Sequence, residues 1–380
     1  MGENTFLHVL SMEDVLKDAP SNELPSANNI KTYYDKYIEL NRKFSEYPVE
    51  MGAMKSAIEQ WKDHLSNELQ RVCKIDNETE RNENLHKLLD EDTILFLNKH
   101  DSSHISKVKE KALDLLKCFT HSTPGCYETF LLLCAITVHD IGNLLGRTNH
   151  EKRIKDMLKS ACVNIIDDSI EIVSISRIAG VHGGRIRNNK DTLSFLQNRT
   201  MVNNLEIREQ LLAAVLRFAD ELADDATRAN YPAIESGILG PASEIYHIYS
   251  SKLHTVKLQQ NPVTGAWEVL LLFDIDEETA KKQFQKIGKK IYLLDEIYEK
   301  TIKMEKERRY CMRYLRPYCS IEKINVEITV EHADNVFEQD KIKYTLEEKG
   351  YPSDPFNSIK DVDSSIITGE EMAAKLSSVD

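Results

Sequence analysis

The apolar residues near the start of the chain recur at the spacing of one helix face. Tyr33, Tyr37, Leu40 and Phe44 stand at i, i+4, i+7 and i+11, which predicts helical structure from about residue 30 onwards. The same spacing continues at Ile58, Trp61, Leu65 and Leu69. The charged residues 74–84 then interrupt the pattern, and we expect a linker there.

Helical spacing dominates the middle of the chain, where proline is almost absent. Apolar residues recur every three to four positions throughout 85–228. The pattern predicts helices over 85–97, 105–120, 126–139, 151–160, 166–181 and 204–223. This part of the chain should therefore form an all-helical domain.

After Pro232 the pattern changes to runs of strand-forming residues. These runs are 245–249, 253–258, 267–273 and 321–330. Turn-forming residues at 261–265 separate the second and third runs, which predicts a β-hairpin. Between the third and fourth runs, residues 277–313 predict one long charged helix.

These elements define the expected fold class and domain organisation. We expect a mainly α protein, with an all-helical core and a smaller C-terminal α+β unit of hairpin, long helix and strand. The expected parts are an N-terminal helical extension (1–84), the helical domain (85–235), the α+β unit (236–350) and a mobile tail (351–380). The tail is assigned from its Ser, Asp and Glu content and its few aromatic residues.

The charge balance limits the classes of partner. The 380 residues include 49 lysines and arginines against 62 aspartates and glutamates, a net charge of −13 with histidine neutral. This balance disfavours extended nucleic acid as a partner, because its backbone rewards clustered positive charge. A local basic cleft for a small phosphorylated substrate, such as a nucleotide, remains compatible with it.

The cellular location is predicted from the absence of a signal peptide, a membrane span and paired cysteines in the sequence. No basic segment followed by an apolar run opens the chain, and the most apolar stretch, 130–138, is far shorter than the ~20 residues of a membrane span. The seven cysteines include no CxxC pair. We expect a cytoplasmic protein with reduced, buried thiols and no membrane partner.

The candidate chemistry begins with a His-Asp pair. His139 and Asp140 follow the apolar helical run 131–138, and Asp220 ends a similar run. A buried carboxylate must be neutralised, hydrogen-bonded or bound to a cation. Together with His104, these residues offer two imidazoles and two carboxylates. That set suits Mn²⁺, Fe²⁺, Ni²⁺ or Zn²⁺, or Mg²⁺ with retained waters.

The order of these residues resembles the HD superfamily of metal-dependent phosphohydrolases over residues 85–231. Phrases similar to the HD-CE type of HD domain occur at 133–142, 147–151, 178–182 and 216–228. The resemblance implies four metal ligands, His104, His139, Asp140 and Asp220, with Asp140 also orienting the nucleophile. His100, one helical turn earlier, is the alternative to His104.

The resemblance also suggests roles for two further histidines. His150 and His182 stand in the order of the additional histidines of dinuclear members, so each is a candidate second-metal ligand or proton donor to the leaving group. An exposed loop residue and a helix-end residue are the alternative interpretations. His182 is followed by Gly183 and Gly184, where dinuclear phosphodiesterases have paired histidines. The number of metals is therefore left at one or two.

Arginines near these histidines are candidate phosphate ligands, because guanidinium groups bind phosphate through two hydrogen bonds. Arg147, Arg185 and Arg228 are the substrate-binding candidates. Arg217 stands at i, i+3 from Asp220, and we interpret it as a residue that steadies that carboxylate.

Three functions are compatible with the sequence. The leading one is a metal-dependent phosphohydrolase that cleaves a nucleotide or nucleotide-like phosphoester with a metal-activated water. A nuclease for single-stranded nucleic acid is the second, and it predicts a basic groove with exposed aromatic residues. The third is a nucleotide-sensing module without turnover. Self-association through the helix 277–313 is also open, although packing within its own domain is favoured.

Overall fold

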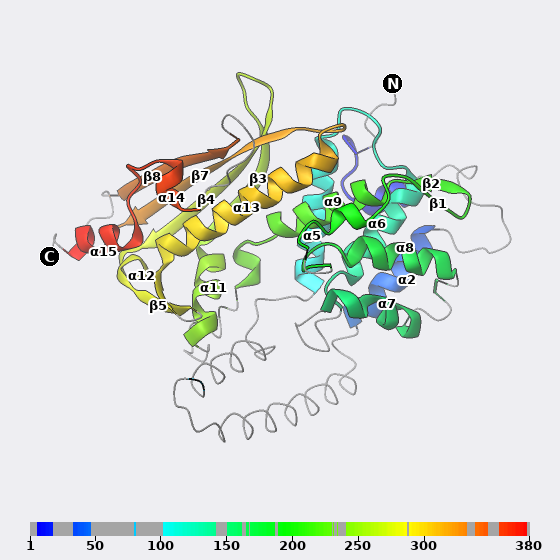
Figure 1. The fold of residues 1–380 in the computed structure, drawn as a ribbon, viewed down its shortest axis with the longest axis horizontal. Helices are drawn as coiled ribbons and strands as arrows, with labels where there is room; N and C mark the ends of the chain where they lie inside the picture. The colour runs from blue at the N-terminus through cyan, green and yellow to red at the C-terminus, as the bar shows by residue number, and fades with distance from the viewer. Residues whose placement is uncertain are drawn as a thin grey trace. The chain divides into compact units, whose positions relative to one another are not determined.

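The computed structural model describes a large part of the chain (Figure 1). The described residues are 6–17, 33–46, 80, 102–141, 150–161, 165–166, 168–186, 189–229, 231, 234, 241–286, 289–332, 339–348 and 357–377. The predicted helices at 58–69 and 85–97 lie outside these ranges, as does nearly all of the predicted linker. The chain divides into two compact units, residues 1–95 with 100–220 and residues 96–99 with 221–380.

The first unit is helical in its described part, which confirms the mainly α prediction. Its helices are α1 (Met12–Lys17), α2 (Tyr33–Glu46), α5 (Ser102–Lys117), α6 (Cys126–Val138), α7 (His150–Ala161), α8 (Ser169–Ala179), the 3-10 turn η4 (Leu193–Phe195) and α9 (Glu209–Leu222), whose last two residues belong to the second unit. A short antiparallel hairpin of β1 (Thr200–Val202) and β2 (Leu205–Ile207) precedes α9.

Helix α6 forms the centre of this unit. All of its residues from Cys126 to Val138 are buried, and it contacts α1, α2, α5 and α8. A helix that is apolar on every side is stable only where other elements surround it. The polar residues at its C-terminal end, His139 and Asp140, are therefore carried into the interior of the unit.

Helix α2 covers α6 with the apolar face that its spacing predicted. Tyr33, Tyr37, Leu40 and Phe44 are all buried. The Tyr37 hydroxyl donates to Glu13 Oε1 at 3.0 Å, and Lys109 Nζ donates to the same hydroxyl at 2.9 Å. These bonds connect α1, α2 and α5.

The β1–β2 hairpin was not predicted from the sequence. The predicted helix 204–223 begins at Glu209, because Asn203 and Asn204 adopt left-handed φ angles of 51° and 64°. Two such residues form the tight turn of a two-residue hairpin. The Asn203 side chain also donates to the Tyr127 hydroxyl at 3.3 Å, which fixes the turn against α6.

The second unit contains a four-stranded mixed sheet with the order β3-β4-β7-β8. Its strands are β3 (Leu253–Gln260), β4 (Trp267–Asp276), β7 (Ile321–Glu331) and β8 (Gln339–Glu347). The pairs β3–β4 and β7–β8 are antiparallel, whereas β4 and β7 are parallel. The hairpin over 253–273 and the strand at 321–330 are thus confirmed, and β8 is an additional strand that the sequence did not predict.

Helix α13 (Leu293–Leu315) covers one face of this sheet (Figure 1). The residues of β4, β7 and β8 alternate between buried and more exposed positions, as expected for a sheet with one covered face. Leu271, Phe273, Val326 and Ile328 are buried on that face. The Thr301 and Tyr344 hydroxyls, 2.8 Å apart, join α13 to β8.

The single long helix predicted over 277–313 is wrong. The chain forms α12 (Glu277–Lys281), then a hairpin of β5 (Gln283–Lys286) and β6 (Lys289–Tyr292), and only then α13. Phe284 and Ile291 face each other across this hairpin, and both are buried. Their burial at one hairpin position favours strands over the helix that their wider spacing indicated.

The prediction of an extended chain at 245–249 is also wrong. These residues lie in α11 (Pro241–Lys252), which follows the 3-10 turn η5 (Ala226–Arg228). Ile245 and Tyr249 are four positions apart and both are buried. Tertiary burial of one helix face outweighs the strand preference of isoleucine and tyrosine.

The chain end differs from the predicted mobile tail. Residues 357–377 include α14 (Ile359–Val362) and α15 (Gly369–Ser377), which contact α13. The Tyr298 hydroxyl donates to the Ile367 carbonyl at 2.7 Å, and the Gly369 N–H donates to Asp295 Oδ1 at 2.9 Å. A Cβ atom at Gly369 would collide with Cβ of Tyr292, so this close approach requires glycine.

Two general features of the described residues follow. No described helix combines the length and the apolar character that a membrane span requires. The five described cysteines, Cys118, Cys126, Cys134, Cys311 and Cys319, are buried and none is in a disulfide.

A buried ion pair fastens α13 to the sheet. Arg308 and Glu305 are both about 1% exposed, and the guanidinium donates to both carboxylate oxygens at 2.6 Å. The same guanidinium also donates to the carbonyl of Ile321, the first residue of β7. Its hydrogen bonds fix the position of α13 relative to β7. The loss of one partner would leave a buried charge without compensation.

We therefore expect Arg308→Ala to destabilise the protein by about 3–5 kcal/mol, because Glu305 would stay buried and charged. Replacement of both residues by leucine should recover much of this loss. The measurement is the urea midpoint of the full chain, followed by circular dichroism. Lys360→Ala serves as the control, because Lys360 and Glu371 form an exposed pair worth at most about 1 kcal/mol. Equal midpoints for the Arg308 and Lys360 variants would contradict the expectation.

Candidate metal centre

Polar side chains from four helices converge within the first unit. His104 lies in the first turn of α5, and His139 and Asp140 follow the last residue of α6. Asp220 lies in the last turn of α9, and His182 follows the C-terminal end of α8. Each is at or near a helix end, so the chain positions them without interrupting the packing of the helices.

The distances among these side chains match those of ligands around a small cation. His104 Nε2 is 3.2 Å from Asp220 Oδ1, and His139 Nε2 is 3.3 Å from Asp140 Oδ2. The potential ligand atoms of His104, His139 and Asp220 all lie within 4.8 Å of one another. Two ligands at about 2.1 Å from one ion are separated by about 3.0–3.5 Å, close to these distances.

Asp140 faces both the inner histidines and His182. Its Oδ2 atom is 3.3 Å from His139 Nε2 and 3.9 Å from His104 Nε2. Its Oδ1 atom is 3.6 Å from His182 Nε2. The His139 and His182 rings meet edge to face, with centroids 5.0 Å apart. The Asp140 carboxylate can therefore interact with His104 and His139 through one oxygen and with His182 through the other.

Backbone carbonyls fix the tautomers of two of the histidines. His139 Nδ1 lies 2.7 Å from the Ile136 carbonyl oxygen, and His182 Nδ1 lies 2.6 Å from that of Ala179. A carbonyl oxygen can only accept a hydrogen bond, so each Nδ1 carries the hydrogen. In the neutral ring, Nε2 then presents its lone pair, and both Nε2 atoms face Asp140. This is the arrangement of a histidine ligand whose second nitrogen is held by a hydrogen bond.

Burial makes the charge of this cluster costly unless it is compensated. His104 and His139 are at most 1% exposed, and the Asp140 and Asp220 side chains are 15% and 26% exposed. Burial works to raise the pKa of Asp220, but hydrogen bonds and charge from His104 and His139 hold that pKa well below its usual value. Burial works to lower the pKa of His139, but Asp140 and Asp220 raise it well above its usual value.

The raised pKa of His139 and the lowered pKa of Asp220 have the same cause. The carboxylates stabilise positive charge at this position, whether it is a proton on an imidazole or a cation. A divalent ion would supply that charge and leave the imidazoles neutral, as ligands must be. The donor set of imidazole nitrogens and carboxylate oxygens therefore fits a divalent metal ion, while the ratio of nitrogen to oxygen leaves its identity open.

Arg217 has two partners that the sequence did not indicate. Its guanidinium donates to Thr192 Oγ1 at 2.8 Å and reaches the Val181 carbonyl at 3.4 Å. Thr192 Oγ1 in turn donates to the same carbonyl at 2.8 Å. The buried Arg217 thus fixes the backbone immediately before His182. Thr192, which the sequence reasoning missed, could have been noticed only from this tertiary contact.

The remaining predicted residues are distributed as follows. Arg147 lies outside the described residues, as do His100 and the side chain of His150, which begins α7. Arg185 is exposed, three positions after His182. Arg228 is 3.7 Å from Asp224 in the second unit, within an ion-pair cluster that includes Lys300. Their substrate-binding roles stay predictions.

The helix ends of the first unit bring together His104, the pair of His139 and Asp140, and Asp220. Residues 84–265 match the family model described as HD-CE. This match is consistent with an HD-type domain, as the resemblance in the sequence predicted. No curated protein and no solved structure matches the chain.

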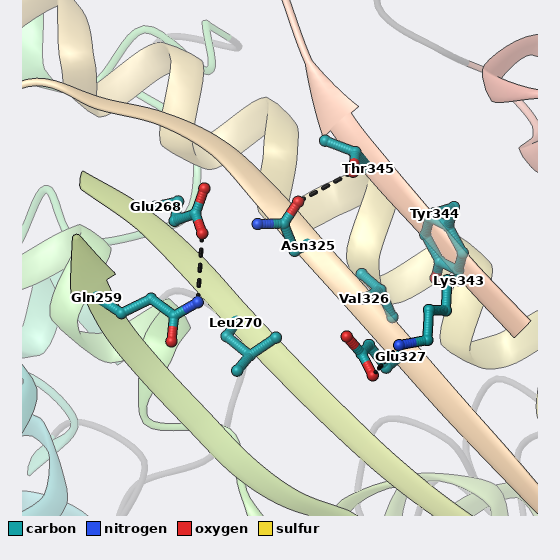
Figure 2. A pocket seen from close by; sticks show the side chains of 9 residues that line it. All are labelled: Gln259, Glu268, Leu270, Asn325, Val326, Glu327, Lys343, Tyr344 and Thr345. Carbon is teal, nitrogen blue, oxygen red and sulfur yellow. Dashed lines mark hydrogen bonds and ion pairs between the residues drawn. The ribbon is translucent and has the colours of Figure 1, made fainter. Parts of the chain in front are cut away.

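The second unit has a shallow pocket of about 360 Å³ on the sheet face opposite α13 (Figure 2). Its polar side chains are matched with one another. Gln259 donates to Glu268 at 3.2 Å, Thr345 donates to Asn325 at 2.9 Å, and Lys343 donates to Glu327 at 2.7 Å. These pairs satisfy the hydrogen-bonding groups of the sheet face, and no histidine or cysteine lines the pocket.

We expect the protein to bind Mn²⁺, and the affinity to fall as the pH is lowered. Each proton that the metal displaces from an imidazole weakens binding by about tenfold per pH unit below the pKa of that imidazole. His139→Ala and Asp220→Ala should each abolish tight binding. Isothermal titration calorimetry between about pH 8 and pH 6 measures both effects.

His121→Ala is the matched control, because His121 is exposed and its Nδ1 contacts the neighbouring Thr120 instead of the cluster. Equal Mn²⁺ affinity in the control and in the His139 variant would show that the cluster holds no metal.

Proposed function

We propose that this protein is a metal-dependent phosphohydrolase that cleaves a nucleotide or nucleotide-like phosphoester. The observation that carries the proposal is the orientation of His139 and His182, whose Nδ1 atoms are held by backbone carbonyls while their Nε2 atoms face Asp140. A purely structural cluster needs no such arrangement, because buried imidazoles are satisfied by any hydrogen-bonding partner. The HD-CE match over 84–265 supports the same class of chemistry.

In this proposal, His104, His139, Asp140 and Asp220 hold the ion. A bound divalent ion supplies Lewis acidity and lowers the pKa of water to near neutrality. Mn²⁺, Mg²⁺, Fe²⁺, Ni²⁺ and Zn²⁺ all accept this donor set, and Mn²⁺ is the ion we would supply first. Asp140 would orient the attacking water, since one of its oxygens faces the inner histidines and the other faces His182.

His182 would act as the proton donor to the leaving group. Its Nε2 atom is 3.6 Å from Asp140 Oδ1, and Arg217 and Thr192 fix the backbone that carries it. Proton transfer by a positioned imidazole contributes about 10²–10⁴-fold to a reaction rate. His150 is the second candidate for this role, and either residue would hold the second ion if two are bound.

Phosphate recognition would come from arginines around the centre. Arg185 is exposed three residues beyond His182, and Arg147 and Arg228 are the other candidates. Guanidinium groups would pair with the non-bridging phosphate oxygens. The net charge of −13 favours a small phosphorylated substrate over a long polyanion. A cytoplasmic location and self-association remain predictions.

The test combines metal content with turnover on one sample. Purified protein and its Asp140→Ala variant would be analysed for bound metal and then incubated with Mn²⁺ and nucleoside mono- and triphosphates, cyclic nucleotides and single-stranded DNA. We expect hydrolysis by the parent protein and a loss of about 10³-fold or more in the variant, because the loss of a ligand disables the ion. His182→Ala should lower kcat by about 10²-fold or more with a smaller change in KM.

His121→Ala again provides the control and should retain full activity. Bound metal without turnover on any substrate would favour a nucleotide-sensing module. Cleavage of single-stranded DNA alone would favour a nuclease. Absence of metal after supply of Mn²⁺ would overturn the proposal.

A further inference from the structure

The chain after α8 leaves the interior of the first unit just beyond His182 and returns to it at Thr192. Val181, His182 and Thr192 are buried, whereas Gly184 and Arg185 are exposed. The two ends of this loop meet, because Thr192 Oγ1 donates to the Val181 carbonyl at 2.8 Å. His182 is thus the last buried residue before the surface, and the loop closes directly beside it.

A buried guanidinium completes this closure. Arg217 Nη1 donates to Thr192 Oγ1 at 2.8 Å and to the Val181 carbonyl at 3.4 Å. The Thr192 residue is fully buried, and Arg217 is 7% exposed. A hydroxyl that accepts from a guanidinium and donates to a carbonyl has its hydrogen directed by both partners, and the charged donor strengthens its bonds. We call Thr192, Arg217 and the Val181 carbonyl the loop clasp.

The loop clasp acts on the peptide that carries His182. The Val181 carbonyl and the His182 N–H belong to one planar peptide unit, so a bond that fixes the oxygen also fixes the nitrogen and the direction of the next Cα. The His182 N–H donates to the Ala179 carbonyl at 3.3 Å, and His182 Nδ1 lies 2.6 Å from the same oxygen. The ring orientation that turns Nε2 towards Asp140 therefore depends on this peptide.

Helix α9 connects the loop clasp with the candidate metal ligands. Arg217 lies one helical turn before Asp220 on this helix. Gln210, also on α9, donates to the Leu196 carbonyl at 2.9 Å and so holds the chain that follows Thr192. One helix thus places both Asp220 and the donor to the Val181 carbonyl, which gives the backbone of His182 a fixed position relative to the cluster.

The end of α8 is completed without the loop clasp. The Gly180 N–H donates to the Ser176 carbonyl at 2.8 Å, which is the backbone bond that closes the last turn. The Val181 carbonyl lies two residues beyond Ala179, the last residue of α8. The two buried side chains of the clasp are therefore directed at the peptide of His182, and the helix end has its own bond.

We propose that Thr192 and Arg217 are positioning residues that hold His182 Nε2 in place for proton transfer to the leaving group. This inference rests on the proposed function, in which His182 is the proton donor. The proton of the His182 imidazolium moves from Nε2 to the leaving oxygen as the bond from phosphorus to that oxygen breaks. Water forms the new bond to phosphorus and gives up a proton, which balances the one transferred. The neutral ring keeps its hydrogen on Nδ1.

The first experiment compares leaving groups in the full-length protein and in Thr192→Val, which removes the hydroxyl and keeps the side-chain shape. With Mn²⁺ present, thymidine 5′-monophosphate is paired with p-nitrophenyl phosphate, and 3′,5′-cyclic AMP with the p-nitrophenyl ester of thymidine 5′-monophosphate. We expect kcat to fall by about 10²-fold where a sugar oxygen leaves, because that oxygen needs the proton. On the p-nitrophenyl esters the loss should be at most about threefold, because nitrophenolate leaves without a proton. The Mn²⁺ affinity should be unchanged.

The second experiment reads the His182 ring in metal-free protein and needs no turnover. Full-length protein with ¹³C-labelled histidine is kept in EDTA at about pH 8, where an ordinary imidazole is neutral. The ring-carbon chemical shifts then distinguish the two neutral tautomers, and the signal that disappears in His182→Asn belongs to His182. We expect the tautomer with hydrogen on Nδ1 in the parent protein and a mixture of both tautomers in Thr192→Val.

Three further variants test whether the effect belongs to the loop clasp. Thr192→Ser keeps the hydroxyl and should restore both the tautomer and kcat. Arg217→Met removes the second donor and should resemble Thr192→Val; if it does not fold by circular dichroism, Thr192→Val decides. Thr129→Val is the matched control, because the Thr129 hydroxyl is also buried and donates to a backbone carbonyl, that of Gly125, at 2.8 Å, but at the other end of α6 from His139. It should behave as the parent protein in both experiments.

Two results would overturn the inference. The first is an unchanged His182 tautomer in Thr192→Val. The second is an equal loss of kcat on both kinds of leaving group, or weaker Mn²⁺ binding, because the clasp would then support the metal centre instead of the proton donor. If the parent protein hydrolyses none of the four substrates, the proposed function fails, and the tautomer measurement alone decides whether the clasp positions His182.

Discussion

The compensation of buried carboxylate charge governs the organisation of the first unit. Asp140 and Asp220 lie mostly buried where the ends of α5, α6 and α9 meet, and an uncompensated charge in such a place costs several kcal/mol. His104 and His139 supply the nearest compensation, and the pKa of Asp220 is held low as a result. Their placement demands that α5, α6 and α9 meet in one register, so the same side chains that suit a cation also specify how the helices pack.

The supports of this cluster are backbone atoms and buried polar side chains, which makes its geometry resistant to change. The carbonyls of Ile136 and Ala179 determine which nitrogen of His139 and His182 carries hydrogen. Arg217 and Thr192 bind the Val181 carbonyl and so hold the turn that leads to His182. In this way His182, which lies beyond the end of α8, has a position as well defined as those of the histidines within or directly after helices.

The second unit also contains a buried, compensated charge, but there the ion pair holds a helix against a sheet. The buried Arg308 joins Glu305 to the first residue of β7, and the sheet face that α13 covers is filled by branched and aromatic residues. With its inner side committed to the sheet, α13 leaves Tyr310, Arg313 and Tyr314 on its outer side.

Local sequence determined the elements whose pattern is strong over several turns: Tyr33 to Phe44 in α2, the apolar α6, and the hairpin around residues 261–265. It also identified the His-Asp pair, because a polar pair at the end of an apolar helix has few physical explanations. Tertiary structure alone decided that Phe284 and Ile291 pair across a hairpin, that Ile245 and Tyr249 lie on a helix, and that Arg217 binds Val181 and Thr192. In each of these cases the deciding contacts are made with other elements of the fold. The free energy of those contacts exceeds the local preference of the residues for helix or strand.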